Sequence, residues 1–310
     1  MSPPVRAWLV AIRPATLPAA IGPVLVGLGV AWPAVGVRPL PAAGCLAVAL
    51  LFQVAANLAN DLFDFRSGAD AGDRMGPPRA AASGLLTERQ LTSAVVVVLV
   101  LAGVVGLGLA AIGGPVVLAL GVLAALSVLA YTGGPWPYGY HGLGEIFVFA
   151  FFGVVAVAGT AYLQLGRWPP VAFAAAVPVG ALVTAILVVN NLRDIDSDRR
   201  AGKRTLAVSL GRRATIVEYV ALLVAAYAVP PVLVLGGAAA PVALLPLASL
   251  PLAVGPLREV AKSDDPRRDP RRLNPVLKAT ARLALVFSGL LAVGLALGLD
   301  LGLDLGGRGG

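Results

Sequence analysis

One short segment contains polar residues that could bind a cation. Their spacing predicts that they lie on one face of a helix. The segment NLANDLFDF carries asparagine and aspartate at i, i+3, i+4 and i+7, which places them on one stripe of a helix. These residues are Asn57, Asn60, Asp61 and Asp64. A helix that ends in such a stripe presents several oxygen ligands in one direction.

A second segment, NNLRDIDSD, repeats this pattern about 130 residues later. Asn191, Asp194 and Asp198 fall at i, i+3 and i+7, with Asn190 beside them. Asp196 faces away from this stripe at helical spacing. We therefore expect two carboxylate-bearing helix faces in the same protein.

Two groups of carboxylates repel each other unless a hard cation lies between them. The chain has one cysteine, Cys45, and one histidine, His141, so a site built on sulfur or imidazole ligands is excluded. Oxygen ligands of this kind favour Mg²⁺, with Mn²⁺ as a substitute. The predicted catalytic residues are Asp61, Asp64, Asp194 and Asp198. The predicted metal ligands are these four aspartates together with Asn60. The alternative is that both segments are solvated helix ends.

A basic stretch follows each segment: RMGPPRAAASG after the first and RRAGKRTLAVSLGRR after the second. Cations beside a predicted Mg²⁺ site suit a diphosphate, whose remaining oxygens they would contact. The predicted diphosphate-binding residues are Arg79, Lys203, Arg204, Asn57 and Asn191. The alternative is that the basic residues only set the membrane topology.

The segment YTGGPWPYGYHGLGE contains no lysine or arginine. Its glycine, proline and aromatic content is typical of a rigid lid over an apolar, ring-shaped substrate. The candidate acceptor-binding residues in this lid are Tyr131, Tyr138, Tyr140 and Glu145. We expect His141, a lone loop histidine, to have no role in the chemistry.

The elements that position these segments are predicted to be membrane-spanning helices. Of the 310 residues, 58% are apolar and 13% are charged, about half the charge of a soluble domain. A bilayer core needs about 17–25 apolar residues per helix. This requirement predicts an all-α, polytopic membrane protein with nine spans in one domain, residues 1–310. The predicted spans are Thr16–Trp32, Pro41–Phe63, Leu91–Ile112, Pro115–Tyr131, Leu143–Leu165, Val171–Leu192, Ala214–Leu235, Ala240–Gly255 and Leu273–Leu299.

The basic residues predict the orientation of these spans. If the N-terminus is cytoplasmic, all of the 24 lysines and arginines except Arg38, Arg167 and Arg308 fall on the cytoplasmic side. Both aspartate segments then face the cytoplasm from a multi-pass protein of the plasma membrane. The eighth span carries prolines at five-residue intervals, from Pro241 to Pro256, and is therefore expected to be kinked or partly unwound.

The chain resembles the UbiA superfamily of intramembrane prenyltransferases. NDLFD, with Asn60, Asp61 and Asp64, matches the first aspartate motif of the superfamily, and the pair Asp194 and Asp198 matches the second. GKRT, from residue 202, is also similar. The resemblance implies a nine-helix bundle with both motifs at its cytoplasmic end. In the superfamily a third aspartate often follows the first motif. Gly68 occupies that position in this chain, and the nearest acidic residue is Asp70.

Within the superfamily, the chain is most similar to the enzymes that prenylate 1,4-dihydroxy-2-naphthoate. The resemblance implies Mg²⁺-dependent transfer of a polyprenyl group from polyprenyl diphosphate to this acceptor, with loss of CO₂ and diphosphate, giving demethylmenaquinol in menaquinone biosynthesis. Arg13 or Lys278 is then the expected partner of the acceptor carboxylate. Two alternatives stay open: another aromatic acceptor, and a secondary transporter that couples to a cation. Nucleic acid is not an expected partner.

Overall fold

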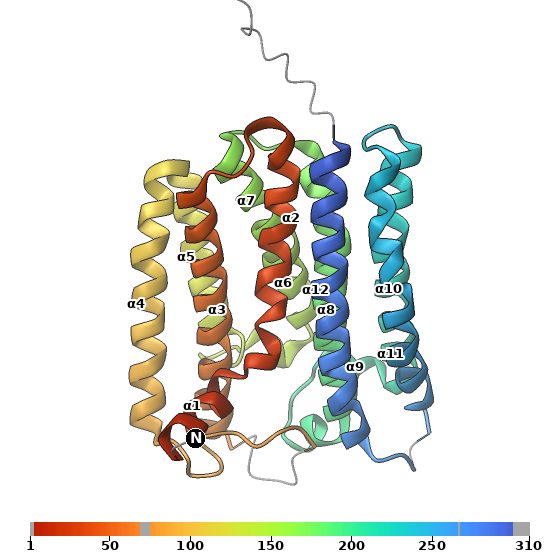
Figure 1. Ribbon diagram of the computed structural model, residues 1–310. Coiled ribbons are helices and arrows are strands. Elements are labelled where there is room, and N and C mark those ends of the chain that lie inside the picture. The colour runs from red at the N-terminus through yellow and green to blue at the C-terminus, as the bar shows by residue number, and fades with distance from the viewer. Residues whose placement is uncertain (1–2, 69–74, 266, 300–310) are drawn as a thin grey trace, which may run out of the picture.

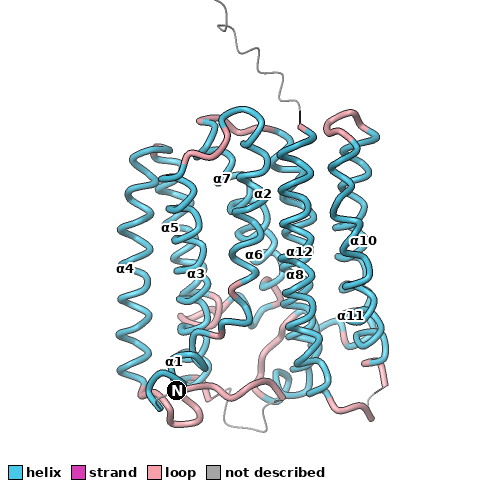
Figure 2. Tube along the Cα trace, viewed as in Figure 1, coloured by secondary structure: helices cyan, strands magenta, loops and turns pink. Residues whose placement is uncertain are grey.

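The computed structural model describes residues 3–68, 75–265 and 267–299. In this part of the chain every regular element is a helix. Figures 1 and 2 show long helices running side by side, with the connecting loops gathered at the two ends of the bundle. The predicted all-α fold is therefore confirmed.

The helices begin with a short N-terminal element, α1 (Pro3–Ile12), and a single 3₁₀ turn (Pro14–Thr16). Proline occupies the first turn of several long helices, where its missing N–H costs nothing. The longer helices are α2 (Pro18–Val35), α3 (Pro39–Arg66), α4 (Glu88–Gly113), α5 (Pro115–Ala130), α8 (Pro170–Arg200), α10 (Arg212–Leu235) and α12 (Leu273–Gly298).

Eight helical stretches among the described residues are long and apolar enough to cross a membrane. The remaining predicted span, the fourth along the chain, corresponds to α5, which is apolar but has only 16 residues. Figure 1 shows the chain passing between the two ends of the bundle along successive helices. The count of nine and the side on which the N-terminus lies stay predictions.

Two of the predicted spans are irregular. The proline-rich eighth span, which was predicted to be kinked or partly unwound, is a 3₁₀ helix over Pro241–Ser249 followed by α11 (Leu250–Lys262). Its first part therefore departs from regular α-helical geometry, but by tighter winding. The fifth span was expected to be one helix. It consists of α6 (Gly144–Val148), a π-helical segment (Phe149–Val155) and α7 (Ala156–Leu165). Such π segments are frequent at functional sites.

Small residues allow the helices around the site to approach closely, as is common in membrane bundles. A side chain at Gly29 of α2 would collide with the backbone of Ala292 in α12. Gly153 of the π segment packs in the same way against Gly180 of α8. The central helix, α8, is the most buried of the candidate spans and carries the second aspartate motif in its last turns.

Candidate functional site

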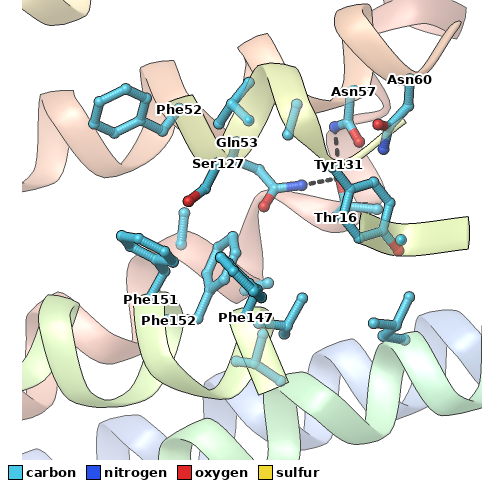
Figure 3. Close-up of a pocket in the computed structure, with 18 of the residues that line it drawn as sticks. Thr16, Phe52, Gln53, Asn57, Asn60, Ser127, Tyr131, Phe147, Phe151 and Phe152 are labelled. Atoms are coloured by element: carbon cyan, nitrogen blue, oxygen red, sulfur yellow. Dashed lines mark hydrogen bonds between the residues drawn. The ribbon is translucent and has the colours of Figure 1, made fainter. Parts of the chain in front are cut away.

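A cavity of about 630 Å³ lies inside the bundle and brings the two aspartate motifs together. Asn60 and Asp64 of α3 line it, as do Asp194 and Asp198 of α8. The remainder of the wall is largely apolar and includes Phe residues from α6 and the π segment, which Figure 3 shows facing α3. The cavity therefore combines the polar side chains of the two motifs with a largely apolar wall.

The first motif divides between the cavity and the loop that follows it. Asn57, Asn60 and Asp64 line the cavity, whereas Asp61 is absent from its described wall. Asp61 is fully buried, and its two carboxylate oxygens accept the backbone N–H groups of Ala80, at 2.9 Å, and Ala81, at 3.2 Å. Asp61 thus fixes the loop after α3. Its predicted role as a metal ligand is untested.

Asp64 is surrounded by donors from three separate segments. Arg79 forms a buried ion pair with one carboxylate oxygen. Lys203 Nζ lies 3.0 Å from the other oxygen, which also accepts the hydroxyl of Tyr140. Arg79 in addition donates to the backbone carbonyl of Asn60. Two predicted diphosphate-binding cations therefore lie directly beside a predicted metal ligand.

The second motif presents Asn190, Asn191, Asp194 and Asp198 to the cavity. Lys203 Nζ lies 3.8 Å from Asp198 Oδ1, so this lysine bridges the two motifs. Asp196 is turned away, as its spacing predicts: it is exposed and pairs with Arg212.

Arg193 is an organising residue that the sequence reasoning missed. It is only 3% exposed and donates to Asp194 through Nε at 2.8 Å, and also to Asn190 and Asn274. Asn274 of α12 in turn donates to the carbonyl of Met75. Arg193 is one of several basic residues near the end of α8. Its place directly before Asp194 and three residues after Asn190 was the signal available in the sequence.

Three residues that were predicted to bind the diphosphate or to form the lid lie away from the cavity or bind other groups of the protein. Arg204 is exposed and absent from the described cavity wall. Asn57 lines the cavity, but its amide donates to the carbonyl of Ile12 and to Thr16. Glu145 is buried behind the wall, where its Oε1 accepts the side-chain amide of Asn191 at 2.7 Å.

The other lid residues form an aromatic wall. Tyr131 and Tyr138 line the cavity in an edge-to-face pair with centroids 5.4 Å apart, and Tyr138 stacks on Phe147 at 4.0 Å. Burial raises the pKa of Tyr138, and burial together with the charge of Asp64 raises the pKa of Tyr140. Both phenols therefore stay neutral. His141 is exposed and stacks on Trp136, and its expected lack of a role in the chemistry stays a prediction.

The donor set fits a hard cation by type. Carboxylate and amide oxygens from both motifs face one cavity, which suits Mg²⁺. In the described residues, no three acidic, cysteine or histidine side chains converge on one metal-sized position. Asp64 and Asp194 are instead neutralised by Arg79, Lys203 and Arg193. Asp70 lies outside the described residues.

Comparison with known proteins places these observations in a family. A model described as the UbiA prenyltransferase family matches residues 20–286. The 1,4-dihydroxy-2-naphthoate octaprenyltransferase of Mycobacterium tuberculosis is 46% identical over 231 residues, covering 74% of this chain and 78% of the relative. The protein of the same name from Escherichia coli is 42% identical over 212 residues, covering 66% and 69%.

Solved structures share the fold at low sequence identity. A UbiA homologue from Archaeoglobus fulgidus bound to DMAPP and Mg²⁺ has a TM-score of 0.62 at 16% identity, covering 92% of this chain and 99% of that one. The apo UbiA homologue from Aeropyrum pernix K1 has a TM-score of 0.63 at 16% identity, covering 86% and 96%. The chain is a multi-pass membrane protein that belongs to the UbiA prenyltransferase family.

Proposed function

We propose that this protein transfers a polyprenyl group from polyprenyl diphosphate to 1,4-dihydroxy-2-naphthoate in menaquinone biosynthesis, with Mg²⁺ bound between the two motifs. The observation that carries the proposal is the cavity, which joins Asn60, Asp64, Asp194 and Asp198 to an apolar chamber. The names of the M. tuberculosis and E. coli relatives support the naphthoate acceptor. The DMAPP and Mg²⁺ in the A. fulgidus homologue support the donor class and the metal.

Asn60, Asp64, Asp194 and Asp198 are the residues that would hold the metal, with Mn²⁺ as a substitute. When bound, the metal neutralises the diphosphate and stabilises it as a leaving group. Asp61 would act through the loop that it fixes. Arg79 and Lys203 contact the Asp64 carboxylate and line the cavity. Both side chains can therefore turn from this carboxylate to the oxygens of a bound diphosphate. Asn191 also lines the cavity and is held by Glu145.

The apolar chamber would hold the isoprenoid chain and exclude water from the allylic carbon. The bond from that carbon to the diphosphate oxygen breaks, and its electrons leave with diphosphate. The allylic carbon then forms a bond to the ring carbon that bears the carboxylate. The bond between this ring carbon and the carboxylate carbon breaks, its electrons return to the ring, and CO₂ leaves. No net proton is taken up or released in this exchange.

The aromatic wall of Tyr131, Tyr138 and Phe147 suits a planar acceptor, because offset and edge-to-face ring contacts are favourable. The neutral phenols of this wall can orient the acceptor without adding a negative charge near its carboxylate. The position of the aspartates argues against a cation-coupled transporter, because they lie in the last turns of α3 and α8 rather than midway along these helices.

The test offers the purified protein one polyprenyl diphosphate, Mg²⁺ and several aromatic acceptors, and identifies the products by mass. The acceptor is labelled in its carboxylate carbon. We expect one labelled CO₂ for each prenyl group transferred to the naphthoate. Label that stays in the prenylated product, or preference for another ring, contradicts the acceptor assignment. Full activity in the presence of a chelator contradicts the metal site.

A further inference from the structure

The connection between α1 and α2 holds an unusual backbone conformation. Arg13 has φ 54° and ψ 69°, and no other non-glycine residue in the described chain has a positive φ. The left-handed region costs an L-residue about 1–2 kcal/mol. Such residues persist where the surrounding structure enforces them, and they cluster at ligand sites.

A polar network from α3 enforces this turn. The Thr16 hydroxyl donates to the carbonyl of Arg13 at 2.9 Å and accepts the amides of Asn57, at 2.9 Å, and Gln53, at 3.1 Å. Asn57 also donates to the carbonyl of Ile12 at 2.8 Å. Figure 3 shows the Gln53 and Asn57 side chains converging on Thr16 at the cavity. The helix that carries the first motif therefore fixes the position of Arg13.

Arg13 itself lines the cavity and is half-buried. The described wall contains three other cationic residues. Arg79 and Lys203 contact Asp64, and Arg200 is exposed. Lys278, the other candidate from the sequence, is exposed and is absent from the described wall. Arg13 is thus a cationic wall residue supplied by the α1–α2 connection rather than by the loops beside the aspartate motifs.

We propose that Arg13 binds the carboxylate of the aromatic acceptor and thereby selects carboxylated rings. This inference rests on the proposed function. A guanidinium fixes a carboxylate through two parallel hydrogen bonds, so it sets the orientation of the ring as well as its affinity. Loss of the carboxylate as CO₂ removes this ion pair, and the uncharged product then leaves the site more readily. Asn57 is a positioning residue for Arg13.

The test compares Arg13→Gln and Arg13→Gly with Lys278→Gln as the control. Glycine adopts the left-handed conformation without strain, so Arg13→Gly removes the cation and preserves the turn. The measurements are the KM for 1,4-dihydroxy-2-naphthoate, the KM for the prenyl diphosphate, and inhibition constants for 1-hydroxy-2-naphthoate and 1-naphthol. The two inhibitors separate recognition of the carboxylate from recognition of the ring.

We expect both Arg13 variants to raise the KM of the naphthoate and the inhibition constant of 1-hydroxy-2-naphthoate by at least about 30-fold. The constant for 1-naphthol and the KM of the prenyl diphosphate should change by less than about 3-fold, and Lys278→Gln should change none of these values. An equal loss for both inhibitors, or an unchanged preference for the carboxylated inhibitor in Arg13→Gly, overturns the inference. Failure of the unaltered protein to prenylate the naphthoate overturns the proposed function instead.

Discussion

The two aspartate motifs lie at the same end of the bundle but are held in different ways. Asp64 is bonded by Arg79, Lys203 and Tyr140, which come from three separate segments. Asp194 is paired with Arg193, its neighbour on the same helix. The first carboxylate thus has partners that can turn to an arriving diphosphate, whereas the second is oriented by its own helix.

Each motif also contains an aspartate that does not face the cavity. Asp61 is completely buried and bonds two backbone N–H groups, whereas Asp196 is exposed and pairs with Arg212. The aspartates outside the cavity therefore have different roles in the two motifs.

The largest effect is expected for the aspartates that face the cavity. Asp64→Asn, Asp194→Asn and Asp198→Asn should each lower turnover by at least about 100-fold, because each removes a charge that acts in the transition state. Asp196→Asn, the matched control, should retain activity within about 3-fold. The assay is steady-state turnover at saturating Mg²⁺. A loss in the control as large as that for Asp64→Asn would refute the division between the two faces.

Asp61→Asn should lower stability and activity together. The amide keeps one acceptor but turns an N–H₂ group toward the N–H groups of residues 80 and 81, and a lost hydrogen bond to a charged group costs about 1.5–3 kcal/mol. We expect a lower Tm and a fall of about 10- to 100-fold in turnover. Mn²⁺ affinity, measured by electron paramagnetic resonance, should change by less than about 3-fold. A loss of Mn²⁺ affinity equal to that of Asp64→Asn would make Asp61 a metal ligand.

Arg193→Gln should lower turnover by about 10-fold and also lower the Tm, because Asp194, Asn190 and Asn274 all lose a donor. Arg193→Lys should recover part of both losses. Arg212→Gln, which removes the exposed pair with Asp196, serves as the control and should change neither by a measurable amount. Equal behaviour of the two glutamine variants would show that Arg193 does not organise the motif.

Tyr140→Phe should lower turnover by about 3- to 10-fold, since Asp64 loses one neutral hydrogen bond while keeping both cations. Burial and the charge of Asp64 raise the pKa of this phenol above its usual value near 10, so it stays protonated below that pH. The pH–rate profiles of the two proteins should therefore have the same shape up to about pH 9.5. An alkaline fall that disappears in Tyr140→Phe would contradict a neutral tyrosine.

The smallest effect is expected for substitutions that only report the sidedness of the two motifs. On a Cys45→Ser background, the first pair is Ala82→Cys, in the connection after α3, and Arg199→Cys, in the last turn of α8. The second pair is Arg167→Cys, in the connection before α8, and Ala238→Cys, in the connection after α10. We expect an impermeant thiol reagent to label the first pair only from the cytoplasm and the second pair only from outside. Activity should be unchanged. Labelling of Ala82→Cys and Arg199→Cys from opposite sides would exclude a shared site.

The membrane helices were predictable because their signals are local. Runs of apolar residues and the prolines of the eighth span determine where helices form and where one departs from α-helical geometry. The π segment inside the fifth span was not predictable. Within this segment Gly153 packs closely against Gly180 of another helix, and no local pattern records that contact.

The candidate site was predictable in its residue types and only partly in its geometry. Helical spacing correctly placed Asn60 with Asp64 and turned Asp196 outward. The same spacing put Asp61 on the metal-binding stripe, and its role as a ligand stays a prediction. The spacing contained no information about the loop at residues 80 and 81, whose N–H groups donate to this carboxylate. Lys203 and Arg204 are adjacent basic residues, and the sequence predicted the same role for both. In the folded protein Arg204 is exposed, whereas Lys203 is partly buried.

The sequence by itself determined that this chain is a helical membrane protein with two aspartate motifs and cationic loops beside them, since hydrophobicity and helical periodicity are properties of neighbouring residues. Only the tertiary structure decided which of those side chains share a cavity, that Arg193 joins α8 to α12, and that α3 holds Arg13 in a left-handed turn. These outcomes depend on contacts between segments 40 to 200 residues apart in the chain. No local pattern records such contacts, because they arise from how the helices pack.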